Sequence, residues 1–170
     1  PATDAQMSAW KAYCKWMTEQ LEGISAQFEI WNEPNHSAFG DGTPEQYAAA
    51  VQAAVESIRS VRPNARIGAM SITGLTADWA YDWYEQALQA GAAENLDAIT
   101  LHPYTTGRYG ETMTGPIKRF LTKAHEYNSD LGVWFTEMGW PTEEHGQTEE
   151  IQAQYITRSY MQWRAEGIND

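Results

Sequence analysis

The sequence is poor in cysteine, in basic residues and in long apolar runs, and each shortage excludes a class of protein. Cys14 is the only cysteine among 170 residues, so no internal disulfide is expected. Lysine and arginine total 11 against 23 aspartates and glutamates, which gives a net charge of −12. This excess of negative charge argues against nucleic acid and against an anionic membrane surface as partners. No apolar run approaches ~20 residues, so no membrane span is expected.

Sequence motifs for metals and nucleotides are also missing. The chain has no His-Glu-x-x-His motif and no paired cysteines, which predicts that it has no catalytic metal. No glycine-rich phosphate loop follows a predicted strand, so we expect no nucleotide and no other cofactor. The chain begins at Pro1 and shows no signal peptide, which suggests a cut or mature N-terminus. We leave the compartment open and favour a secreted or extracellular one over the cytoplasm.

Apolar periodicity divides the chain into alternating helices and strands within one predicted domain, residues 1–170. Trp79 and Trp83 share the apolar stripe of the third helix, which predicts that both pack in the core. The expected elements are a helix at 5–21, a strand at 27–31, a helix after Thr43, a strand at 65–72, a helix from Trp79 to Gly91, a strand at 96–101, a helix from Pro116, a strand at 131–136 and a helix from Thr148 to Gly167.

The four strands end at regular intervals. Their ends fall near residues 33, 70, 104 and 137, and such a repeated βα unit predicts a parallel sheet built by right-handed crossovers. We therefore predict an α/β fold, a partial (β/α)8 TIM barrel with about four parallel strands. A complete barrel takes about 250 residues and eight strands. The chain is thus either a fragment of a barrel or a shortened barrel with open sheet edges.

Open sheet edges have a consequence for association. Four parallel strands alone leave two unpaired edges, which predicts self-association into a homodimer or a higher oligomer. Two half-barrels that complete a ring of eight strands are one arrangement. Local rearrangement of the termini to cover the edges is the alternative.

Two glutamates are expected at the carboxyl ends of strands, where α/β proteins place their chemistry. Glu33 ends the apolar run that begins at residue 28, and Pro34 cannot continue a central strand. Glu137 ends a second apolar run in the same way. The alternation of side chains along a strand predicts that Glu29, Trp31 and Glu33 share a face toward the barrel interior. Two strand-end carboxylates favour glycoside hydrolysis.

Other residues near the same predicted rim are candidates for substrate contact. His102 and Tyr104 share a face of the strand between the two glutamates, with a structural histidine and a packed tyrosine as the alternatives. Asn32 is either a sugar ligand or a turn residue before proline. Trp31 and Trp140 are either sugar platforms or wall packing. The complete set is Asn32, Tyr104, His102, Trp140, Trp31 and His36.

Three of these segments carry a resemblance to a known group. Trp31-Asn32-Glu33-Pro34 resembles the strand-four signature of glycoside hydrolase clan A, and His102-Pro103-Tyr104 resembles its strand-six segment. Thr136-Glu137-Met138-Gly139-Trp140 resembles the nucleophile motif of strand seven. Within the clan, the chain looks most similar to family 39 and its endo-glycosidase and β-xylosidase relatives. The resemblance covers nearly the whole chain as the fourth to seventh βα units, without the first three strands or the eighth.

The resemblance implies a retaining mechanism on a neutral β-glucan, xylan or related oligosaccharide. Glu33 would be the general acid and Glu137 the nucleophile, while Tyr104 would donate to Glu137 and Asn32 would bind the 2-hydroxyl group of the sugar. The alternative is a truncated half-barrel that binds carbohydrate or self-associates with little or no turnover. A scaffold or interaction protein is disfavoured, because the paired carboxylate motifs would have no role in one.

Overall fold

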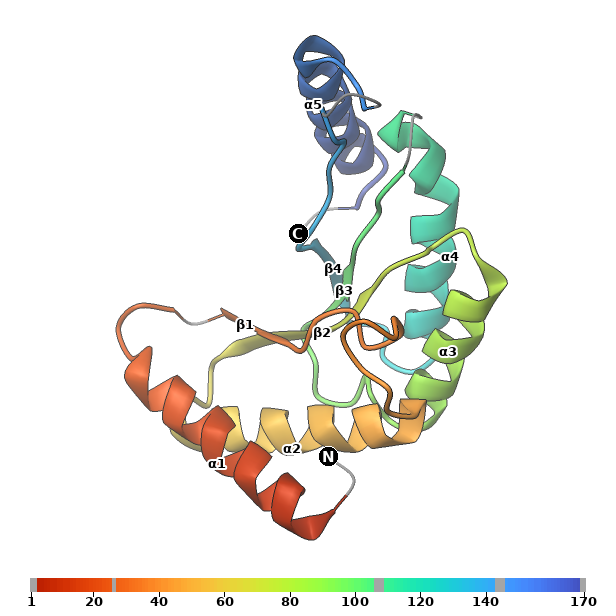
Figure 1. Ribbon diagram of the computed structural model, residues 1–170. Coiled ribbons are helices and arrows are strands. Elements are labelled where there is room, and N and C mark those ends of the chain that lie inside the picture. Colours follow the sequence, from red (N-terminus) through yellow and green to blue (C-terminus); the bar gives the residue numbers. More distant parts are fainter. Residues whose placement is uncertain (1–2, 26, 106–108, 143–145, 169–170) are drawn as a thin grey trace.

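The structure is a computed structural model, and it describes residues 3–25, 27–105, 109–142 and 146–168 (Figure 1). Helices and strands alternate along the chain as the sequence predicts. The elements are α1 (Asp4–Gln20), β1 (Gln27–Ile30), α2 (Pro44–Val61), β2 (Arg66–Ile72), α3 (Asp78–Gln89), β3 (Ala98–Leu101), the 3-10 helix η1 (Gly110–Met113), α4 (Thr114–His125), β4 (Gly132–Phe135) and α5 (Glu149–Ala165).

The four strands form one parallel sheet in the order β1-β2-β3-β4. Figure 1 shows α2, α3 and α4 along one face of the sheet, which is the side that right-handed crossovers produce. This arrangement confirms the predicted parallel sheet of βα units. Strands β1 and β4 are its edges. The self-association expected from these edges stays a prediction.

Threonines begin three of the helices and explain where the chain turns from loop to helix. The side chains of Thr3, Thr43 and Thr148 accept hydrogen bonds from backbone N–H groups in the first turns of α1, α2 and α5. In α1 and α2 a glutamine at the third helical position completes a capping box, and Pro44 begins α2. In the described part of the chain, no helix has both the length and the apolar character needed to cross a membrane.

The core lies between the sheet and the helices. It is built from fully buried aliphatic side chains of β2 and β3 and from the inward faces of α2, α3 and α4, including Val51, Ile67, Ile72, Leu88, Ile99, Leu101, Ile117 and Phe120. Cys14 of α1 is also buried, and burial raises the pKa of its thiol to about 11. This thiol therefore stays protonated at neutral pH, as a structural cysteine would.

The prediction that Trp79 and Trp83 both lie in the core was wrong for Trp79. The ring of Trp83 packs against Tyr47 at a centroid distance of 5.3 Å, but Trp79 is 51% exposed. Trp79 lies in the first turn of α3 and covers Gly74, in the turn after β2. A Cβ atom at Gly74 would lie 2.8 Å from the Trp79 ring, and the φ of +74° favours glycine there. Trp79 therefore covers a turn at the end of the sheet, outside the core.

Tyr47 fixes the end of β2 beside the end of β1. Its hydroxyl accepts from the backbone N–H of Met70 at 2.8 Å and donates to the carbonyl of Ile30 at 3.2 Å. Met70 and Ser71 have positive φ values of 103° and 42°, and the register of β2 and β3 shifts at this point. The irregular backbone of β2 leaves the N–H of Met70 in need of a partner, which the buried phenol supplies.

We expect Tyr47→Phe to lower the free energy of unfolding by about 1–3 kcal/mol, because it leaves two buried backbone groups without partners. Urea unfolding followed by circular dichroism measures this loss. Tyr160→Phe is the matched control, since Tyr160 is 59% exposed, and its change should stay within about 0.5 kcal/mol. Equal stabilities for the two variants would contradict a bridging role for the Tyr47 hydroxyl.

Candidate active site

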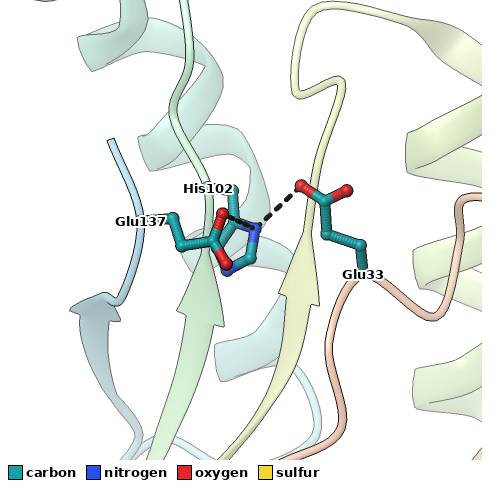
Figure 2. Close-up of side chains that lie close together, drawn as sticks. All are labelled: Glu33, His102 and Glu137. Atoms are coloured by element: carbon teal, nitrogen blue, oxygen red, sulfur yellow. Dashed lines mark hydrogen bonds and ion pairs between the residues drawn. The ribbon is translucent and has the colours of Figure 1, made fainter. Parts of the chain in front are cut away.

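The ends of the four strands place polar side chains at one end of the sheet. Glu33 follows β1, His102 follows β3 directly, and Glu137 follows β4. Glu33 has a φ of +39°, a left-handed conformation that is uncommon for a residue other than glycine. The chain thus turns sharply at Glu33 instead of continuing β1, and this turn points the carboxyl group toward β3 (Figure 2).

The prediction that Trp31 shares a face with Glu29 and Glu33 was wrong. Trp31 has a φ of +70°, which interrupts the alternation of side chains at the end of β1. Its indole packs edge-on against Trp10 of α1 at 5.7 Å and donates to the carbonyl of Phe39 at 3.1 Å. The Trp31 ring therefore contacts α1 and the loop after β1 instead of joining the two glutamates.

His102 lies between the two glutamates and contacts both of them (Figure 2). Its Nδ1 lies 2.9 Å from Glu33 Oε1, which is a hydrogen bond, and 3.6 Å from Glu137 Oε2. One donor atom from each of the three residues lies within 4.8 Å of the other two. The structure thus brings together three of the residues that the sequence singled out, and one imidazole nitrogen links the two carboxyl groups.

The two carboxyl groups differ in their exposure to water. The side chain of Glu33 is 11% exposed, whereas that of Glu137 is 42% exposed, and the His102 side chain is fully buried. Glu33 is therefore largely shielded from water, whereas Glu137 is open to it.

Tyr104 contacts Glu137, as the resemblance implies. Its hydroxyl donates to Glu137 Oε2 at 3.1 Å. Burial of the phenol and, next, the hydrogen bond to Glu137 raise the pKa of Tyr104, so the hydroxyl keeps the proton that it donates. This hydrogen bond holds one oxygen of Glu137 beside the tyrosine ring.

A second group of polar residues lies behind His102, and sequence reasoning did not assign it a role. His102 Nε2 lies 3.1 Å from Thr136 Oγ1, and Thr136 Oγ1 donates to Glu29 Oε1 at 2.8 Å. Ser71 Oγ donates to the same oxygen at 2.7 Å. The period of two along β1 already places Glu29 on the inner face, and that signal could have identified it. Nothing comparable indicated Ser71, because its orientation depends on the irregular end of β2.

The remaining predicted site residues are Asn32, His36 and Trp140. Asn32 is half-buried directly before Glu33. His36 is exposed in the loop after β1, where its Nδ1 accepts from the N–H of Ala38 at 3.2 Å. Trp140 is 3% exposed and packs edge-on against Tyr155 of α5 at 5.5 Å. This burial favours the wall-packing interpretation of Trp140 over a sugar platform.

Three residues offer donor atoms that could hold a cation. Glu33, His102 and Glu137 each provide one such atom within the 4.8 Å cluster. Nδ1 of His102 and Oε1 of Glu33 already share a hydrogen bond of 2.9 Å. The prediction that the chain uses no catalytic metal stays a prediction.

The sequence matches the model of the glycosyl hydrolase catalytic core family over residues 4–166. The chain belongs to this family. The match spans all the helices and strands of the fold and both glutamates. It agrees with the resemblance to clan A that Glu33, His102 and Glu137 suggested.

The relatives of this glycosyl hydrolase chain include enzymes of family 39. A β-xylosidase from Geobacillus stearothermophilus is 28% identical over 80 residues, which are 46% of this chain and 16% of that protein. A family 39 glycoside hydrolase from Bacteroides cellulosilyticus has a TM-score of 0.73 at 19% identity, over 96% of this chain and 36% of the other. A family 39 β-xylosidase from Caulobacter crescentus has a TM-score of 0.60 at 20% identity, over 90% and 35%.

The structural likeness establishes the fold of this glycosyl hydrolase chain. Its four strands and their helices correspond to part of a (β/α)8 barrel, which confirms the predicted fold class. The chain spans about a third of the length of the family 39 structures that it matches. Its fold is like part of the fold of these family 39 structures.

Proposed function

We propose that this chain carries the catalytic carboxylates of a retaining β-glycosidase that acts on β-glucan, xylan or related oligosaccharides. One observation carries the proposal: an oxygen of Glu33 and an oxygen of Glu137 lie within 4.8 Å of each other, beside the His102 ring. Retaining glycosidases hold their two carboxyl groups about 5–5.5 Å apart, whereas inverting enzymes leave about 6.5–9.5 Å for a water molecule. The short separation supports direct attack by one carboxylate.

The first chemical step assigns a different role to each glutamate. Glu33, the more buried of the two, donates its proton to the glycosidic oxygen while the bond to the anomeric carbon breaks. Glu137 attacks that carbon from the opposite side of the sugar and forms a covalent glycosyl-enzyme. Tyr104 supports this role, because its hydroxyl binds the ionised Glu137. Asn32 would bind the 2-hydroxyl group, a contact that strengthens in the transition state.

In the second step Glu33 acts as a base. Once Glu137 is esterified, its negative charge is gone, and the Glu33 carboxylate no longer lies beside another anion. Glu33 then takes a proton from water, and the resulting hydroxide equivalent releases the sugar from Glu137 with the original β configuration. His102 lies 3.6 Å from Glu137 and also contacts Glu33. The loss of charge on Glu137 therefore changes the electrostatic field at the pair formed by His102 and Glu33.

The chemical class of substrate follows from the charge and from the relatives. A chain with a net charge of −12 favours a neutral ligand over an anionic one. The relatives named above include β-xylosidases, and a curdlan-specific exo-β-1,3-glucanase from Blastomyces gilchristii matches at a TM-score of 0.59 over 84% of this chain. These names support a β-linked glucan or xylan as the substrate class.

A second candidate function is carbohydrate binding with little or no turnover. The observation that favours it is the open sheet, because β1 and β4 have no further strand beside them in the described structure. A sugar at Glu33 and Glu137 would then contact only part of the wall that a closed barrel provides.

The test is the stereochemistry of the first product. The chain is mixed with 4-nitrophenyl β-xyloside and 4-nitrophenyl β-glucoside, and proton NMR spectra are recorded within the first minutes. We expect the β-anomer to appear first and to mutarotate later, because two displacements retain the configuration. Initial formation of the α-anomer would overturn the retaining assignment. Saturable binding of xylo- or gluco-oligosaccharides in calorimetry, without hydrolysis, would favour the second candidate function.

A further inference from the structure

The hydroxyl of Thr136 decides which nitrogen of His102 carries a proton. A threonine hydroxyl has one hydrogen to donate and lone pairs to accept. Thr136 Oγ1 donates its hydrogen to Glu29 Oε1 at 2.8 Å. Its contact with His102 Nε2 at 3.1 Å is then one in which Thr136 accepts and the histidine donates. Nε2 of His102 therefore carries a hydrogen.

Glu29 holds Thr136 in this orientation. Ser71 Oγ and Thr136 Oγ1 both direct hydrogen bonds at the same Glu29 oxygen, at 2.7 Å and 2.8 Å. Ser71 is in turn fixed, since its N–H donates to Thr100 Oγ1 at 2.7 Å and its hydroxyl lies 3.1 Å from that oxygen. The carboxylate acts as an acceptor for both hydroxyls, and neither can turn its hydrogen away without losing a charge-assisted bond.

We propose that Glu29 and Thr136 are positioning residues that keep Glu33 in its acid form through His102. A neutral imidazole with its hydrogen on Nε2 has a bare lone pair on Nδ1. Nδ1 lies 2.9 Å from Glu33 Oε1, so the hydrogen in this bond belongs to the Glu33 carboxyl group, which donates it. The opposite tautomer would donate from Nδ1 to an ionised Glu33 and would leave it without a proton for the leaving group. The inference rests on the proposed function, because it takes Glu33 to be the general acid.

The charged and titratable groups around the pair come from the neighbouring strands and the segments that follow them. The carboxyl groups of Glu29, from β1, and Glu137, after β4, approach from two elements, and the neutral phenol of Tyr104 follows β3. On β2 the neighbour is Ser71, which does not titrate in the accessible pH range. Arg66, at the opposite end of β2, lies over the ring of Trp134 at 5.3 Å.

Nitrogen-15 NMR tests the tautomer directly and needs no turnover. Protonated and bare imidazole nitrogens give well-separated signals, and loss of a signal set in His102→Gln assigns it among the four histidines. In the wild-type chain at neutral pH, we expect His102 to be neutral with its hydrogen on Nε2. Thr136→Val removes the acceptor for that hydrogen and keeps the shape of the side chain. We expect this variant to show the hydrogen on Nδ1, either wholly or in exchange with Nε2.

The controls separate the hydroxyl from its surroundings. Thr136→Ser keeps the hydroxyl and should keep the wild-type tautomer. Thr112→Val removes an exposed threonine hydroxyl in η1, which donates to the carbonyl of Tyr109, and should leave the His102 signals unchanged. A wild-type hydrogen on Nδ1, a doubly protonated His102 across the neutral range, or a wild-type tautomer in Thr136→Val would each overturn the proposal.

A pH profile connects the tautomer with catalysis. In Thr136→Val, the alkaline limb of kcat/KM for an aryl β-glycoside should move to lower pH by roughly one unit, since the acid form of Glu33 loses about one hydrogen bond. Thr136→Ser should restore the wild-type limb. If the NMR signals agree with the proposal but the wild type hydrolyses nothing, the proposed function fails and the tautomer assignment stands. If the wild type hydrolyses the glycoside but its His102 carries the hydrogen on Nδ1, the tautomer assignment fails and the proposed function stands.

Discussion

Glu137→Ala is expected to lower kcat for hydrolysis of an activated aryl β-glycoside by about 10⁴-fold or more, because it removes the group that forms the covalent intermediate. Glu137 lies 3.1 Å from the Tyr104 hydroxyl and 3.6 Å from His102 Nδ1, and no other carboxylate of the described residues occupies its place beside both. The measurement is the steady-state release of 4-nitrophenol or 2,4-dinitrophenol from the matching β-xyloside or β-glucoside.

Added azide provides the decisive control for Glu137. The missing side chain leaves space on the α face of the sugar, so azide should restore turnover and give an α-glycosyl azide. Glu22→Gln also removes one carboxylate, but from an exposed position beyond α1, and should retain wild-type activity. Full activity in Glu137→Ala, or a β-glycosyl azide as its product, would show that Glu137 is not the nucleophile.

Glu33→Ala is expected to show a loss of activity that depends on the leaving group. A disaccharide needs protonation of its departing oxygen, so its kcat/KM should fall by about 10²–10⁴-fold, the usual contribution of general acid catalysis. A 2,4-dinitrophenyl glycoside leaves without a proton, and its kcat/KM should change by less than about tenfold. Initial rates for the two substrates at several pH values measure this difference, and the alkaline limb of the profile should disappear.

Azide and an isosteric variant complete the test of Glu33. Azide should accelerate Glu33→Ala by attacking the glycosyl-enzyme from the β face, which yields a β-glycosyl azide, opposite to the product of Glu137→Ala. Glu33→Gln keeps the size of the side chain and should show the same dependence on leaving group. Equal losses for both substrates would assign Glu33 to binding instead of proton transfer.

The sequence predicts the architecture well because its signals are local. Threonine caps, proline at the start of α2 and apolar stripes each act within a few residues, so the order of helices and strands agrees with the structure. The regular spacing of strand ends was enough to predict a parallel sheet. The same local rules fail where the backbone is irregular. Trp31 is the clearest example, since a φ of +70° reverses the face that a regular strand would give it.

The site was predicted in its chemistry but only partly in its contacts. Motifs identified Glu33 and Glu137 as the acids of interest and placed His102 and Tyr104 between them. They did not show that His102 contacts both acids, or that Thr136 links it to Glu29. Such contacts depend on the register of neighbouring strands and on the irregular end of β2, which no single stretch of sequence specifies.

The amino-acid sequence by itself determined the kinds of groups available and the order in which strands deliver them to one end of the sheet. Only the tertiary structure decided that two carboxyl groups far apart in the chain approach within 4.8 Å, and which hydrogen bonds surround them. The physical reason is that periodicity and capping act over one or two turns of chain. Distances between strand ends are set by the twist and register of the whole sheet.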